Sequence, residues 1–146
     1  MSDIILGITG SRDFSLEGEK LIQEVIASYC TDPSVEAIIF GGARGSDTVA
    51  LRAALNSRKD YTPKLIVALP VNLAYQPKDT QIITSQADEL VEMSLTGKDM
   101  YRVRNQYIVN NCTQLVAFWN GDEKSGTAQT IRLAKSDKKL VEVYFV

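Results

Sequence analysis

Histidine is absent from the chain of 146 residues. A Ser-His-Asp triad and a Cys-His pair are therefore excluded, because both need an imidazole as general base. Zinc sites with His ligands are excluded too, and the two cysteines, Cys30 and Cys112, are too few to form a site of thiolates. Any chemistry must depend on carboxylates, Arg, Lys, Tyr or hydroxyl groups. We expect no metal and no cofactor.

Paired cysteines, membrane spans and a strong basic charge are absent as well. Two cysteines in no paired motif predict free thiols, which favours the reducing cytoplasm. No apolar stretch approaches the ~20 residues of a membrane span, and no signal segment precedes the first apolar run. The net charge of -2 excludes a basic field over the whole protein, but it is compatible with a local basic patch.

Short apolar runs alternate with segments of helical spacing. Continuous apolar runs, typical of strands buried on both faces of a parallel sheet, occupy residues 4–8, 37–40, 65–69 and 115–119. Helical spacing occurs near residues 21–29, 49–54, 82–90, 100–108 and 131–134, and shorter strands are expected at 90–93 and, as an edge, at 141–145. The pattern predicts a single domain over residues 1–146. Its fold class is α/β, a Rossmann-like three-layer sandwich with a mainly parallel sheet and helices on both faces.

Loops that follow the strands are the candidates for a site, because ligands of open parallel sheets bind beyond the carboxyl ends of the strands. The first of these loops begins with Gly10, Ser11 and Arg12. Gly10 allows the backbone to approach a ligand closely. Ser11 can donate a hydrogen bond to a phosphate, and Arg12 can bind one with two parallel hydrogen bonds. Taken alone, this loop is equally compatible with a plain strand-to-helix turn.

The segment at residues 41–47 carries the strongest local signal. Three glycines in five residues expose backbone N–H groups directly before a helix N-terminus, and this combination binds anions. Arg44 has no evident structural role and is expected to face the crevice, while Asp47 is placed to cap the helix. The candidate residues of this segment are Gly41, Gly42, Arg44, Gly45, Ser46 and Asp47.

Two further segments complete the candidate site. Arg104 and Asn105 lie at the start of a predicted helix, where Asn is a mediocre helix former and a suitable partner for a sugar or a base. An ordinary solvated helix face is the alternative interpretation. Ser125, Gly126 and Thr127 place two hydroxyl groups and a flexible backbone at another helix N-terminus. Here the alternative is that Ser125 only caps the helix.

Together these segments place three arginines, Arg12, Arg44 and Arg104, around one crevice. Arginines gathered at helix N-termini repel one another unless an anion is bound between them, so we expect a phosphate ligand. No G-x-G-x-x-G motif follows the first strand, which disfavours ordinary NAD binding. The Gly-Lys pair at residues 97–98 lacks the spacing and the Ser or Thr of a P-loop, which disfavours ATP hydrolysis of that type.

Five segments in a fixed order also carry a family resemblance. They are residues 10–14 (Gly-Ser-Arg-Asp-Phe), 41–47 (Gly-Gly-Ala-Arg-Gly-Ser-Asp), 75–79 (Tyr-Gln-Pro-Lys-Asp), 104–108 (Arg-Asn-Gln-Tyr-Ile) and 125–127 (Ser-Gly-Thr). In this order they resemble the SLOG superfamily. More closely, the chain resembles the Rossmann domain of the DNA-processing protein A (DprA, or Smf) family and its short stand-alone relatives. The resemblance covers nearly the whole chain.

Several functions are implied by this resemblance. DprA proteins bind single-stranded DNA and help to load recombinase, and other SLOG domains sense nucleotide-derived signals. The "Lonely guy" relatives cleave the bond between ribose and base in nucleoside monophosphates, with a catalytic Glu shortly after a Gly-Thr pair. Here Gly126 and Thr127 are followed by Ala128 and Gln129. Because Gln cannot ionise, it cannot stabilise an oxocarbenium-like centre as a carboxylate does.

Three functions therefore stay open. The first, which we favour, is non-catalytic binding or sensing of a small phosphate-bearing, nucleotide-derived ligand in the crevice. Arg12, Arg44 and the amides around Gly42 and Gly45 would hold a phosphate. Asn105 would contact a sugar or a base. A second phosphate or a ribose would bind to Ser125 and Thr127.

The second function is DprA-like binding of single-stranded DNA, with bases stacked on Phe14, Tyr75 or Tyr101. The third is a nucleoside 5'-monophosphate phosphoribohydrolase, an N-glycosidase. Because related domains often pair, a homodimer is an expected assembly. No membrane partner is expected.

Overall fold

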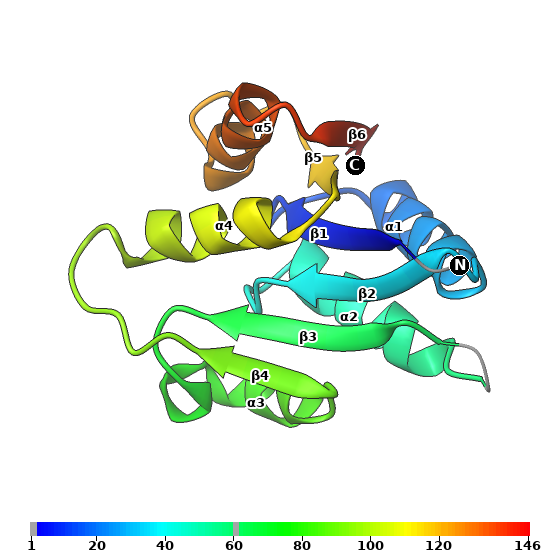
Figure 1. The fold of residues 1–146 in the computed structure, drawn as a ribbon, viewed down its shortest axis with the longest axis horizontal. Coiled ribbons are helices and arrows are strands. Elements are labelled where there is room, and N and C mark those ends of the chain that lie inside the picture. Colours follow the sequence, from blue (N-terminus) through cyan, green and yellow to red (C-terminus); the bar gives the residue numbers. More distant parts are fainter. Residues whose placement is uncertain (1–2, 60–61) are drawn as a thin grey trace.

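A parallel sheet forms the centre of the molecule. The computed structural model describes residues 3–59 and 62–146. Its strands are β1 (Ile4–Gly10), β2 (Val35–Phe40), β3 (Lys64–Leu69), β4 (Glu89–Glu92), β5 (Gln114–Trp119) and β6 (Leu140–Phe145). Its helices are α1 (Leu16–Cys30), α2 (Ser46–Asn56), α3 (Lys78–Ser85), α4 (Met100–Asn111) and α5 (Gly126–Ser136), with a 3-10 helix, η1, at Leu73–Tyr75. The strands pair in the order β4-β3-β2-β1-β5-β6, and every one of these pairings is parallel (Figure 1).

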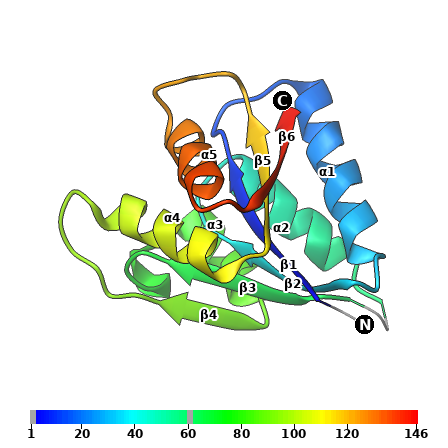
Figure 2. The ribbon, with the colours of Figure 1, turned by 45° about the horizontal axis from the view of Figure 1, so that its top comes forward.

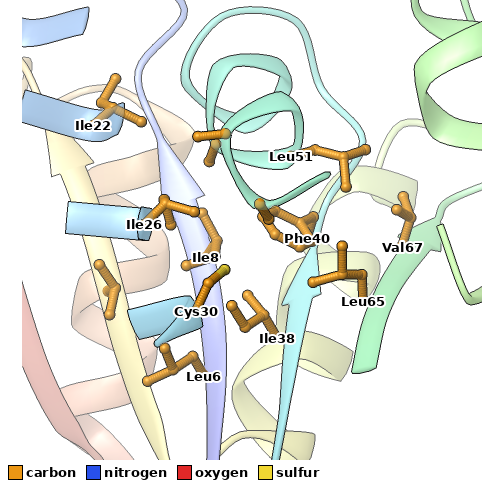
Figure 3. Packing of buried hydrophobic residues seen from close by; sticks show 14 of the residues in the cluster. Leu6, Ile8, Ile22, Ile26, Cys30, Ile38, Phe40, Leu51, Leu65 and Val67 are labelled. Carbon is orange, nitrogen blue, oxygen red and sulfur yellow. The ribbon is translucent and has the colours of Figure 1, made fainter. Parts of the chain in front are cut away.

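Helices cover both faces of the sheet, so the predicted three-layer α/β sandwich is confirmed. Helices α1, α2 and α3 contribute to the core on one face, and α4 and α5 to the core on the other (Figure 2). In the first core, Ile22 and Ile26 of α1 lie over Ile8, Ile38 and Phe40 of the strands (Figure 3). The second core consists of Ile39, Ala68, Ile108, Val109, Leu115, Ala117, Ile131 and Ala134.

One predicted helix is too long. Helical spacing extended the prediction to residue 90, but α3 ends at Ser85, Gln86 is its C-cap and Leu90 pairs with Val67 inside β4. The reason lies in Asp88, which draws the chain into the sheet. Its backbone N–H donates to the Leu65 carbonyl, and its Oδ2 accepts from the Leu65 N–H at 2.8 Å.

The position of a site follows from the order of the strands. Strands β1 to β4 are added one after another on one side of the sheet, and the chain then crosses through α4 to β5, on the other side of β1. The connections after β1 and after β5 therefore run to opposite faces. In open parallel sheets a crevice forms at such a switch point, beyond the carboxyl ends of the strands.

Both cysteines are free thiols, as predicted, and both are buried. Burial raises the pKa of the Cys30 thiol to about 11 and also raises the pKa of Cys112, so both stay protonated near neutral pH. Within residues 3–59 and 62–146, no helix has the length and apolar character needed to cross a membrane.

Candidate functional site

A hollow of about 360 Å³ lies at the switch point, beyond the ends of β1, β2 and β5. We call it the main crevice. It is lined by most of the residues predicted from the loops, namely Gly10, Ser11, Arg12, Gly41, Asp47, Arg104, Asn105, Ser125, Gly126 and Thr127. A second hollow of about 200 Å³ contains Gly42 and Arg44. The two hollows share a wall made of Arg12, Gly41, Ala43, Tyr101 and Arg104.

Gly45 and Ser46 line neither hollow and join two loops instead. The Ser46 N–H and Oγ both donate to the Ser11 carbonyl, at 3.1 and 2.6 Å. Gly45 has a φ of +86° and lies so close to Arg12 that an added Cβ would be 2.5 Å from the Arg12 Cα. Gly10 is crowded in the same way, because its Cβ would lie 2.3 Å from the Ser46 Cβ. These residues hold the β1–α1 loop against the start of α2.

One backbone amide of residues 41–47 is bound by a carboxylate of the chain itself. Asp47 was predicted to cap α2, and this is wrong, because the N-cap is Gly45 and no side chain caps the helix. The side chain of Asp47 turns back, and its Oδ2 accepts from the Ala43 N–H at 3.3 Å. Asp47 is only 5% exposed, and its Oδ1 has no hydrogen-bond partner among the described residues.

Arg104 of α4 crosses the bottom of the crevice and is only 6% exposed. Its Nη1 donates to the Gly41 carbonyl, and its Nε donates to Asn105 Oδ1 at 2.8 Å. The guanidinium also lies 5.8 Å from the ring centre of Tyr101. Burial lowers the pKa of Arg104, and the charge of Asp47 opposes that shift. The interpretation as a solvated helix face is therefore wrong for Arg104, whose guanidinium joins α4 to the end of β2.

Arg44 lies away from the main crevice, contrary to expectation. It lines the second hollow, and its Nη2 lies 3.2 Å from Asp79 Oδ1 near the start of α3. Both side chains of this ion pair are largely exposed, and such pairs contribute little to stability. Gln76 closes the same hollow from the other side, with its Nε2 donating to the Gly42 carbonyl at 2.7 Å.

The N-terminus of α5 opens into the main crevice. Ser125 caps the helix, which is the alternative role considered for it from the sequence, with its Oγ accepting from the Ala128 N–H at 3.1 Å. The amides of Gly126 and Thr127 come before the first intrahelical hydrogen bond, and the described residues offer them no acceptor. A Cβ added to Gly126 would meet nothing within 4 Å, so the backbone there is open. This helix start keeps its free N–H groups and its positive dipole end.

Comparison with known proteins places this geometry in a family. The sequence model of the family described as DNA recombination-mediator protein A matches residues 1–145. The chain belongs to this family. The resemblance to DprA proteins that the motifs predicted is thereby confirmed. Among curated proteins, no match to the sequence was found.

Solved structures share the fold of this DNA recombination-mediator protein A family member. The DNA processing protein A of Streptococcus pneumoniae aligns with a TM-score of 0.78 and 23% identity, over 96% of this chain and 50% of that one. The DNA processing protein A of Helicobacter pylori, which has a single-stranded DNA binding mode, aligns with a TM-score of 0.78 and 20% identity, over 97% of this chain and 65% of that one. A molybdenum cofactor binding protein from Rippkaea orientalis aligns with a TM-score of 0.72 and 18% identity, over 98% of this chain and 77% of that one. The chain thus spans half to two thirds of the two DNA processing proteins.

The aromatic residues proposed for stacking differ in their positions in this family member. Tyr101 is 47% exposed and lines both hollows. Tyr75 is exposed but lines neither hollow, and Phe14 is half-buried against the core and also lines neither. Among these three aromatic residues, Tyr101 alone is placed to contact a ligand in the crevice.

Three residues of the same loops that were not included in the predicted site also line the main crevice. Asn120 follows β5 directly, and its N–H donates to Ser11 Oγ at 3.0 Å while its Nδ2 donates to the Asp13 carbonyl at 3.1 Å. Asp13 and Asp122 line the same hollow. The rule that ligands bind beyond strand ends could have found Asn120, since it is the first residue after a buried strand. Gln129 is not among the lining residues.

Asp47 predicts a specific dependence of stability on pH. Burial raises its pKa to about 6, against the opposing effects of Arg104 and the Ala43 N–H. In the unfolded chain its pKa is about 4, so the folded state prefers the protonated form. Protonated Asp47 therefore stabilises the folded state fully below about pH 4, and this stabilisation is lost as the pH rises through about 6.

We expect the free energy of unfolding of the wild type, relative to Asp47→Asn, to fall by ~2 kcal/mol between pH 4 and pH 7.5, since each pKa unit corresponds to ~1.4 kcal/mol. Urea denaturation of both proteins across this range measures the difference. The variant serves as the control, because the other titrating groups are common to both. A difference that does not change with pH would show that the carboxyl group titrates normally.

Proposed function

We propose that the main crevice binds a small phosphate-bearing, nucleotide-derived ligand. One observation carries this proposal: the free amides of Gly126 and Thr127 open into the same hollow as Arg12. A helix N-terminus with unpaired N–H groups binds phosphate, and an arginine beside it supplies two further parallel donors. The volume of about 360 Å³ lies within the usual range for sites of small ligands.

The lining of the crevice offers two kinds of contact. The α5 N-terminus, Ser11, Arg12 and the Thr127 hydroxyl would hold the phosphate. Asn105 and Tyr101 would hold the rest of the ligand, since an amide can contact a sugar or a base and a ring can stack on the base. Within residues 41–47, the Ala43 amide is already bound by Asp47, and Gly41 lines the wall of the crevice.

Single-stranded DNA is the second candidate ligand. Family membership supports it, since a relative of the same fold binds single-stranded DNA. The shared wall also supports it, because a strand with a base on Tyr101 could continue from the main crevice toward Arg44 in the second hollow. DNA binding of this kind weakens steeply with added salt.

Arg12→Ala and Arg44→Ala form a matched pair that tests the proposal. For nucleoside mono-, di- and triphosphates we expect Arg12→Ala to weaken binding 10- to 100-fold, since hydrogen bonds to a charged group contribute ~1.5–3 kcal/mol. Arg44→Ala should change it less than threefold. Isothermal calorimetry and thermal shift with the wild type and both variants measure this.

Other outcomes would redirect or overturn the proposal. If a short single-stranded oligonucleotide binds while mononucleotides do not, and both variants weaken it, the DNA function replaces the nucleotide function. Equal loss from both variants with a mononucleotide would contradict the assignment of the phosphate to Arg12. Chromatography of the recovered ligand should show it intact. Release of free base would identify a glycosidase.

A further inference from the structure

Asp47 lines the main crevice, and its carboxylate has only part of its hydrogen bonds. Oδ2 has its donor in the Ala43 N–H, whereas Oδ1 is without a partner in the part of the chain that the structure describes. A buried carboxylate oxygen without a donor is costly. Arg104 does not donate to Oδ1. Its Nη1 donates to the Gly41 carbonyl and its Nε to Asn105 Oδ1. Among the described residues, no ion pair within 4.0 Å includes Asp47.

The same carboxylate decides where a phosphate can and cannot bind. A phosphate placed on the Ala43 amide would displace Asp47 and lie against its negative charge. At the α5 N-terminus, by contrast, Gly126 is open and the first amides are free. A ligand that fills the crevice therefore directs its anionic group toward α5 and a neutral group toward Asp47.

Oδ1 itself has almost no exposed surface. We therefore infer that Asp47 is a specificity-determining residue, whose carboxylate shifts toward a bound ligand and accepts a hydrogen bond from an O–H or N–H group on the neutral end of that ligand. The inference rests on the proposed function, because it needs a ligand in the main crevice. The donor can be a ribose hydroxyl or an N–H group of a base, and a ligand without a donor at this end leaves the carboxylate unpaired.

Removing single donors from the ligand tests the inference. The probes are adenosine 5'-monophosphate, its 2'-deoxy and 2',3'-dideoxy forms, and purine riboside 5'-monophosphate, which lacks the amino group. With the wild type, removal of one donor should weaken binding at least 10-fold. Loss with the deoxy forms identifies a sugar hydroxyl, and loss with the purine riboside identifies the base.

Asp47→Asn is the matched protein variant. The amide oxygen of Asn can still accept from the Ala43 N–H, and its NH₂ group then stands in place of Oδ1. This variant should bind the complete ligand and the donor-deficient analogue within threefold of each other. If removal of every donor weakens binding to the wild type and to Asp47→Asn equally, the inference is overturned.

Two controls keep the outcomes apart. Arg12→Ala should weaken the binding of all probes by the same factor. Binding that Arg12→Ala leaves unchanged would contradict the proposed function. Binding that Arg12→Ala weakens, but that shows no coupling between Asp47 and the donor of the ligand, would contradict only this inference. If Asp47→Asn fails to fold, the wild type labelled with ¹³C at its aspartate carboxyl groups gives a second readout. The Asp47 ¹³Cγ resonance should move with the complete ligand and stay in place with the donor-deficient analogue. The same displacement with both would overturn the inference.

Discussion

Gly45→Ala is expected to destabilise the protein by about 2–4 kcal/mol, as the sum of two effects. The residue has a φ of +86°, where an alanine is strained by ~1 kcal/mol. In addition, the new Cβ would lie 2.5 Å from the Arg12 Cα and 2.6 Å from the Arg12 carbonyl oxygen. These are backbone atoms, which cannot rotate away, so the β1–α1 loop must separate from α2, and overpacking of this kind costs ~1–3 kcal/mol.

Gly97→Ala is the matched control. Gly97 also has a positive φ, +91°, but nothing lies within 4 Å of its Cβ position. Gly97→Ala should be destabilised only by the ~1 kcal/mol of backbone strain. Urea denaturation of both variants measures the two losses, and their difference isolates the contact with Arg12. Equal losses would show that the loop moves aside at no cost and that Gly45 is needed only for its conformation.

The layers of the fold could be predicted because they depend on local patterns. A run such as residues 37–40 is apolar at every position, and this composition is stable only where helices cover both faces. Leu90 shows the limit of such reasoning. Its spacing fits a helix and a strand equally, and the decision comes from Asp88 pairing with Leu65, a contact between segments 23 residues apart.

The same distinction separates correct from incorrect predictions in the site. Ser125 caps α5 through a contact three residues away, so its role was visible in the sequence. The partner of Arg44 is Asp79, 35 residues away, and the partner of Arg104 is the carbonyl of Gly41, 63 residues away. No rule of local spacing could have shown that Arg104 lines both hollows and that Arg44 lines only the second.

The contact between Arg104 and Gly41 carries the second large prediction. Replacing Arg104 with methionine keeps a long side chain but removes the donors to the Gly41 carbonyl and to Asn105 Oδ1. It also removes the positive charge that favours ionised Asp47 in the crevice wall. Losing one partner of a buried charged group costs ~3–5 kcal/mol, so we expect Arg104→Met to be destabilised by that amount in urea denaturation at pH 7.5.

Arg102→Met, on the same helix with an exposed side chain, is the control and should change stability by less than about 0.5 kcal/mol. The double variant Arg104→Met/Asp47→Asn should recover about 1–2 kcal/mol of the loss, because it removes the carboxylate that the arginine balanced. The recovery should shrink below pH 6, where Asp47 is already protonated in the fold. Strictly additive losses at pH 7.5 would mean that Arg104 acts only through its hydrogen bonds. The charge of Arg104 would then make no contribution to the stability of ionised Asp47.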